Sequence, residues 1–418
     1  MKFRSLPLFL AIIFSCGAAR PAEAAQAAAL TLSQALERAF ARNPELVISE
    51  LEIKAASARV AQAGVKPNPE IAAEAENVSL PGSGGLLRYT ESTLQVNQRL
   101  ELGGKRDLRV RAAKKEVTVA SSQLELKKAE LILAVSKTFA EVLSGQERLT
   151  NHRELSRLAR QSHAIVVERV AAGKVSPVEQ TRASVVLASA ILEEEKRRQA
   201  LAAAKDRLAA LWGGSGLEIQ EAQGRFEIPA AIKEIMESCL QDNPEMKLAA
   251  AATDFRSAAL ELELANRKPD VTFSAGFRRL NLDNVQALVA GVSIPLPLFD
   301  KRQGAIAEAR IRLEQSQSEQ TATQWRLRSA LVQARHEHET ALQEATALRE
   351  TALPAAREAA AAVEEGYRLG KFDFIDVLDA QRTLAELQGR TIEAVASGMR
   401  AAIEIDRLAR CNPLPPAK

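Results

Sequence analysis

Apolar residues recur at helical spacing along most of this chain, and in two places they alternate with the period of a β-strand. Gly and Pro residues mark where the helical pattern stops. We expect helices at residues 31–65, 105–170, 177–212, 231–268, 304–366 and 374–410, the first interrupted at Asn43-Pro44 and the fifth bent at Pro354. The longest would extend roughly 100 Å, which is unusual for a helix of a soluble globular protein.

The two alternating stretches predict strand hairpins at residues 70–100 and 271–295. Each strand is about ten residues long, the length of a tilted strand that crosses an outer membrane. Four antiparallel strands in one chain leave open edges, and only a closed barrel is stable in lipid. Several chains must therefore close it, with eight, twelve or sixteen strands from two, three or four copies.

The order of elements repeats, which indicates an internal duplication into residues 25–222 and 223–418. Each half contains a helix, a strand hairpin, a long helix, a turn and a further helix, and the second ends in a C-terminal tail. The turns lie at residues 171–177 and 368–374. In each half the two shorter helices together match the long one, so they can stack end to end beside it.

Composition supports long packed helices rather than one thick core. Hydrophobic residues make up 46% of the chain but aromatic residues only 4%, which suits narrow seams in which Ala lets helices approach. The formal net charge is +3, so no basic footprint for nucleic acid is present.

The N-terminus has the pattern of a secretory signal, residues 1–24. Lys2 and Arg4 precede an apolar run, and Ala22-Glu23-Ala24 is a small-x-small cleavage site. Cys16 offers an alternative, lipoprotein-type cleavage site. The signal leads us to expect an exported chain. No other apolar run is long enough for a membrane-spanning helix, so we expect no such helix.

The turn before the last helix carries the candidate chemistry. Gly370 tolerates the positive φ that a tight reversal needs. Asp376 and Asp379 share one helix face just beyond it. They are either ordinary carboxylates at a helix N-terminus, where the dipole favours them, or part of an opening through which cations pass.

These features resemble the TolC-type outer membrane factors of Gram-negative efflux and secretion systems, over about residues 30–410. The motifs that carry the resemblance are Leu32-Ser-Gln-Ala-Leu36, Asn43-Pro-Glu-Leu46, Leu102-Gly-Gly-Lys-Arg106, Pro295-Leu-Pro-Leu-Phe-Asp300 and residues 367–381. The resemblance implies a mainly α fold with a transmembrane β-barrel. A homotrimer would form twelve strands in the outer membrane and a helical tunnel through the periplasm. The implied partners are a periplasmic adaptor and an inner-membrane resistance-nodulation-division pump.

The resemblance also implies roles for the turn residues. Asp376 and Asp379 would ring the entrance, and Tyr367 would constrict it. The turns that would contact the adaptor contain Gly173, Lys174, Val175 and Ser176 in the first half and Gly370, Lys371 and Phe372 in the second. Phe372 stands where the family's best-known member has an Arg that latches the tip. The residues that latch the tip of this chain are therefore not predicted.

The cargo is inferred from one junction. Gly103-Gly-Lys-Arg106 and the short hairpins look most like the cobalt-zinc-cadmium branch, which exports heavy-metal cations. A duct for drugs or for type I secretion of polypeptides is an alternative. A non-conducting periplasmic spacer is another, but it would not need two strand hairpins.

No catalytic grouping, cofactor motif or metal-ligand spacing is visible, so no enzyme is expected. His336 and His338 lie on different helix faces and are interpreted as surface residues. In the resembling family the regions around Cys239 and Cys411 meet in a belt around the tunnel, so these two residues could form a disulfide.

Overall fold

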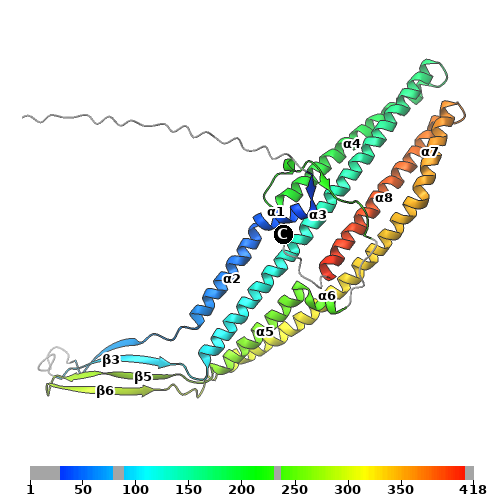
Figure 1. Ribbon diagram of the computed structural model, residues 1–418. Coiled ribbons are helices and arrows are strands. Elements are labelled where there is room, and N and C mark those ends of the chain that lie inside the picture. Colours follow the sequence, from blue (N-terminus) through cyan, green and yellow to red (C-terminus); the bar gives the residue numbers. More distant parts are fainter. Residues whose placement is uncertain (1–28, 79–88, 230–236, 410–418) are drawn as a thin grey trace, which may run out of the picture.

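A computed structural model describes residues 29–78, 89–229 and 237–409 of the chain (Figure 1). The molecule is elongated, with a β-sheet at one end and two helical hairpins at the other. The expected signal peptide, with Cys16, lies outside the described residues, and so do Cys411 and the side chain of Cys239. Cleavage and the disulfide therefore stay predictions.

The sheet has four antiparallel strands in the order β2-β3-β5-β6. β2 (Glu70–Glu76) and β3 (Glu91–Leu100) form one hairpin, and β5 (Val271–Leu280) and β6 (Val285–Ser293) form the other. β3 pairs with β5, so that Leu94 lies opposite Phe277 and both halves of the chain share one sheet. In the described residues β2 and β6 each pair on one side only.

The first two helices of the chain begin where polar side chains replace missing backbone bonds. α1 (Leu32–Arg42) starts with a capping box between Thr31 and Gln34. Asn43 caps α2 (Pro44–Ala63), accepting a bond from the Glu45 N–H at 2.9 Å. α3 (Lys105–Ala171) and α4 (Pro177–Ala210) form the first helical hairpin. α2 and α4 both pack on α3, in agreement with the expectation that the two shorter helices lie beside the long one.

The second half corrects the expectation of a helix over residues 231–268. A 3₁₀ segment, η2 (Glu237–Asp242), precedes α5 (Pro244–Ala265), and residues 230–236 are not described. Asn243 caps α5 through its side chain and has extended backbone, so a continuous helix cannot run through it. The Asn–Pro pair here starts a helix, as Asn43-Pro44 does in the first half.

The expected helix over residues 304–366 is also interrupted. It consists of α6 (Gln303–Ala347), a π-helical segment η3 (Leu348–Ala352) and α7 (Leu353–Arg368). Pro354 has no N–H and its ring would clash with the carbonyl four residues earlier, so the wider π turn accommodates it. α8 (Phe374–Ala409) completes the second hairpin.

A small cap covers the middle of the first half. β1 (Leu30–Thr31) pairs in parallel with β4 (Ala222–Gln223), and η1 (Gly216–Glu218) lies nearby in the chain. Their apolar residues complete the largest core cluster, which includes Val135, Phe139, Val142, Leu208, Trp212 and Ile219. This cap is short compared with the helices that it covers.

The helices lie side by side in a row rather than around one core (Figure 1). α3 contacts α2, α4, α5 and α8, while α6 contacts α5 and α8, and α7 contacts α8. The row therefore ends on one side with α4 and with α2, which leads into β2, and on the other side with α7 and with α6, which follows β6. Of the described helices, none is both long and apolar enough to cross a membrane.

A buried ion pair fastens the two halves where sheet and helices meet. Lys105 Nζ lies 2.5 Å from Asp270 Oδ1, and only 7% of Lys105 is exposed. The Leu102 N–H donates to the same carboxylate oxygen at 3.3 Å. Gly103 has a φ of +76° and lies against Lys268, so a larger residue would be both strained and crowded. The Gly103–Arg106 junction thus joins α3 to the segment that enters β5.

Candidate functional site

The turn that connects α3 to α4 forms the exposed tip of the first hairpin. Gly173 has a φ of +67°, and the Lys174 N–H donates to the Arg169 carbonyl at 2.9 Å. The Ser176 hydroxyl then accepts from the Val178 N–H at 3.3 Å, and Pro177 opens α4. Lys174 and Ser176 are exposed, while Val175 is half-buried.

The second turn has the same backbone geometry. Gly370 has a φ of +77°, and the Lys371 N–H donates to the Gly366 carbonyl at 2.8 Å. The Phe372 ring packs over Gly366, where any Cβ would overlap it. Leu369, Phe372 and Ile375 are exposed, so this tip presents apolar side chains to solvent.

Tyr367 lies between the two hairpins and is only 3% exposed. Its hydroxyl donates to Glu179 Oε2 of α4 at 3.0 Å. The Arg169 guanidinium of α3 lies 4.3 Å from the centre of the Tyr367 ring and donates to the Tyr367 carbonyl oxygen. Phe374 packs against the same ring, with 5.6 Å between ring centres. Tyr367 therefore connects the tip of the second hairpin to both helices of the first.

Burial and, secondarily, the bond to Glu179 raise the pKa of the Tyr367 hydroxyl to about 12. The hydroxyl is therefore a protonated donor throughout the physiological pH range. Phe372 had left the tip without predicted contacts between the hairpins, and the structure shows such contacts among Arg169, Tyr367 and Glu179. Sequence reasoning missed Arg169 and Glu179 because the Tyr367–Glu179 bond spans 188 positions of the chain.

Asp376 and Asp379 lie exposed in the first turns of α8. One Asp376 oxygen accepts the Asp373 backbone N–H at 3.0 Å, so this carboxylate helps to cap the helix. Gln381, one turn further on, donates to Ser162 of α3 at 2.9 Å and faces the first hairpin. In one chain both carboxylates reach solvent, and a ring of them would need further copies.

One face of the sheet is apolar and no described element covers it. Cross-strand neighbours on this face include Ile71, Leu94, Phe277, Leu288 and Val292. Phe277 is 66% exposed and Leu288 is 77% exposed. An uncovered apolar face of this kind is typical of a surface that contacts another protein or a membrane.

The other face of the sheet is polar and partly charged. Arg278 on β5 lies 3.1 Å from Glu91 and 3.3 Å from Glu76, and its Nε donates to the Thr93 hydroxyl at 3.0 Å. These bonds join β2, β3 and β5 across one surface. The sheet is therefore amphipathic, because successive side chains of a strand point to opposite faces and apolar and polar residues alternate along these strands.

The histidines do not form a metal centre. Among the described residues, no group of three or more His, Cys, Asp or Glu side chains is placed to hold a metal ion. His336 is exposed, as expected. The surface assignment of His338 was wrong: it is 3% exposed, and its Nε2 lies 3.0 Å from the Pro229 carbonyl oxygen. That carbonyl lies 109 positions away, so helical spacing gave no signal of it.

Comparison with known proteins gives a family-level match along most of the chain. A family model described as "Outer membrane efflux protein" matches residues 35–214 and 235–409. The cobalt-zinc-cadmium resistance protein CzcC of Cupriavidus metallidurans is 34% identical over 91% of this chain and 90% of its own. The nickel and cobalt resistance protein CnrC of the same organism is 28% identical over 68% of this chain and 67% of its own. The crystal structure of CusC has the same fold, with a TM-score of 0.76 at 18% identity over 90% of this chain and 91% of that one.

Replacement of Tyr367 by Phe should remove the hydrogen bond to Glu179 and, with the hydroxyl, the ionisation of this side chain at high pH. Since the Tyr367 pKa is higher in the fold than the ordinary value of 10, its contribution to stability is complete below pH 10 and is lost as pH rises through 12. The chain has two tyrosines, so the 295 nm absorbance titration of the folded protein should contain one step near pH 12. Tyr367→Phe should abolish that step and Tyr89→Phe should retain it. A step near 12 that survives in Tyr367→Phe would contradict the assignment.

Proposed function

This chain belongs to the outer membrane efflux protein family, and we propose that it is the outer membrane exit channel of a tripartite system that exports heavy-metal cations. The carrying observation is the uncovered apolar face of a sheet whose two outer strands are open. A periplasmic spacer would not need such a face, because water would surround it on both sides.

In the proposed assembly the apolar face contacts lipid. Backbone groups at an open strand edge have no water to bind in a bilayer, so the edges of β2 and β6 need partners. Three copies with four strands each would close a twelve-stranded barrel. The polar face with Arg278, Glu76 and Glu91 would then line the interior. The repeated halves, residues 25–222 and 223–418, belong to the same proposal of a duplicated chain.

The edges of the helical row support assembly from copies of this chain. α2 at one edge exposes Val47, Ile48 and Leu51. α6 at the other edge exposes Ile311, Trp325 and Val332, which lie at multiples of seven residues. Such spacing is typical of a coiled-coil seam that lacks its partner. In a ring of copies, α2 of one chain would pack against α6 of the next.

We expect Trp325→Glu to weaken this assembly at least tenfold, because it puts a charge into an apolar seam. Trp325 is 70% exposed in the single chain. Native mass spectrometry in detergent would measure the trimer fraction. The matched control is Leu217→Glu, at a 92% exposed residue of η1, and it should leave the trimer intact. Equal trimer fractions in both variants would argue against the α2–α6 seam.

The two tips are proposed to contact the periplasmic adaptor of a resistance-nodulation-division pump. The first presents Gly173, Lys174, Val175 and Ser176, and the second presents Gly370, Lys371 and Phe372. Both are exposed, and the second offers the apolar side chains of Leu369, Phe372 and Ile375 to a partner. The Tyr367 contacts would hold the tips together until the adaptor draws the hairpins apart.

The entrance is proposed to be lined by Asp376 and Asp379, with Tyr367 beside them. Three copies would bring six carboxylates around one opening, and rings of Asp favour cations electrostatically. The one Asp376 oxygen that caps α8 does not prevent this, because the carboxylate keeps its charge and is exposed.

Asp376→Asn combined with Asp379→Asn should therefore lower the preference of the channel for cations. Reversal potentials in planar bilayers under a potassium chloride gradient would measure it, and we expect the cation-to-anion permeability ratio to fall several-fold towards one. Asp254→Asn, in an exposed pair with Lys115 far from the tips, is the matched control. An unchanged ratio in the double variant would remove the acidic ring from the proposal.

The cargo proposal rests on the named functions of the relatives, in particular the cobalt-zinc-cadmium resistance protein. We expect a strain that lacks this chain to lose tolerance to cobalt, zinc and cadmium, measured as minimal inhibitory concentrations, and to regain it when the gene is restored. Its tolerance to hydrophobic drugs should not change. Sensitivity to drugs alone would instead make the chain a multidrug exit duct.

A further inference from the structure

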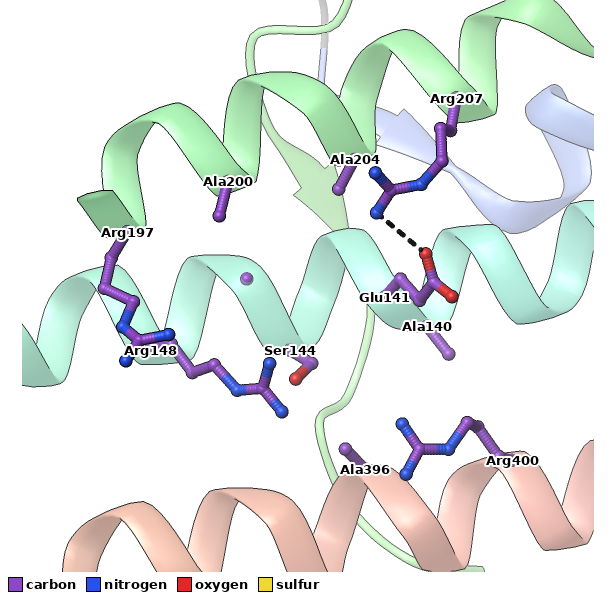
Figure 2. A pocket seen from close by; sticks show the side chains of 11 residues that line it. Ala140, Glu141, Ser144, Arg148, Arg197, Ala200, Ala204, Arg207, Ala396 and Arg400 are labelled. Atoms are coloured by element: carbon purple, nitrogen blue, oxygen red, sulfur yellow. Dashed lines mark hydrogen bonds and ion pairs between the residues drawn. The ribbon is translucent and has the colours of Figure 1, made fainter. Parts of the chain in front are cut away.

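A cavity of about 230 Å³ lies between α3, α4 and α8, near the middle of the helical row (Figure 2). Four arginines from the three helices line it: Arg148, Arg197, Arg207 and Arg400. Small residues, among them Ala200, Ala204 and Ala396, leave the space between the helices open. Neither the tips nor the sheet contribute to this cavity.

The arginines differ in how fully their charges are balanced. Arg207 pairs with Glu141 at 3.1 Å, and Glu393 bridges Arg148 and Arg400, the latter at 2.9 Å. The carboxylate nearest to Arg197 is Glu193 at 3.5 Å, but Glu193 lies 2.6 Å from Lys196 and is largely engaged there. Arg197 is therefore the least neutralised of the four, and positive charge is in excess around the cavity.

Two polar groups at the cavity have no partner among the described residues. The Ser144 hydroxyl oxygen is one, and only 4% of Ser144 is exposed. Other hydroxyls of α3, such as those of Ser121 and Thr138, bond to the carbonyl four residues earlier. The second group is Nε of Arg197, which is buried although the rest of its side chain is not. A buried polar group without a partner is costly, so each is a place where a ligand gains affinity.

We propose that this cavity binds a small free oxyanion of the phosphate or sulfate class, held by Arg197, the Ser144 hydroxyl, Arg148 and Arg400. Guanidinium groups and a hydroxyl are the donors that such an anion requires. Figure 2 shows the Arg148 and Arg400 side chains extending from α3 and α8 on opposite sides of the space, with Arg197 entering from α4. The bound anion would tie the first helical hairpin to α8.

A lipid headgroup is not the source of this anion. Ser144 lies about 58 Å along α3 from Lys105, where the helix leaves the sheet, at 1.5 Å per residue. The proposed membrane surface is at the sheet end, beyond the reach of a headgroup. The proposal does not depend on the cargo or on the acidic ring, because the site is complete within one chain.

Titration of the purified full-length protein in detergent with inorganic phosphate, at constant ionic strength, tests the site by calorimetry. We expect saturable binding in the wild-type protein and in Arg198→Gln, whose side chain belongs to the next position of α4 and does not line the cavity. Arg197→Gln should weaken binding at least tenfold, the effect of one lost charge-assisted bond. Circular dichroism would check that the variants are folded.

Ser144→Ala provides a second test, since it removes only the hydroxyl and adds no bulk to the cavity. It should weaken phosphate binding several-fold and leave the helical content unchanged. Absence of binding in the wild-type protein would overturn the proposal, and so would equal affinity in the wild type, Arg197→Gln and Ser144→Ala. An acidic side chain of another copy in the cavity would produce the first of these results.

Discussion

The single chain has strand edges without hydrogen-bond partners and apolar surfaces that its described residues leave uncovered. The outer strands β2 and β6 pair on one side only, and the sheet has an apolar face that no described element covers. The helical row exposes apolar side chains on α2 and α6 at its two sides. Unpaired backbone and exposed apolar area are both unfavourable in water, which supports the proposed assembly of several copies into one closed structure. The open sides of the sheet and of the helical row coincide, which allows one set of neighbours to complete both.

α3 is the helix that connects the sheet, the first tip and both halves of the chain. It runs from the sheet to the first tip and contacts helices of both halves, including α5 and α8. At its start, the buried Lys105–Asp270 pair joins it to the strand that begins the second hairpin. A buried pair contributes little net stability compared with an apolar contact, but breaking it leaves a charge without a partner. The β3–β5 ladder sets the register in which the two halves meet, and the loss of either partner of this pair would leave a charge uncompensated at that junction.

Several polar contacts connect the hairpins further along. At the tips, Tyr367 contacts Glu179 and Arg169. Near the middle, Glu393 of α8 contacts Arg148 of α3 beside the arginine-lined cavity. Apolar packing accompanies the first contact, in which Val166, Phe374 and Val377 are buried together with Tyr367. The tips are thus held by few side chains, and a partner that competes for those contacts could separate the hairpins without unfolding the rest.

The amino-acid sequence by itself determined the long helices and the two strand hairpins of this protein, and their order. Gly173 marked a helix end and Pro177 a helix start, and strict alternation marked β5, because these signals act through the local backbone. The family motifs identified the fold and the functional class. The π segment η3 and the start of α5 at Pro244 were missed, although Pro354 and Asn243 were visible, since the outcome at each Pro depends on what packs around it. Tertiary structure alone decided that Tyr367 meets Glu179, that His338 is buried, and that Arg148, Arg197 and Arg400 surround one cavity. Those partners are far apart in the chain, and only the packing of three helices brings them within the short range over which hydrogen bonds and ion pairs act.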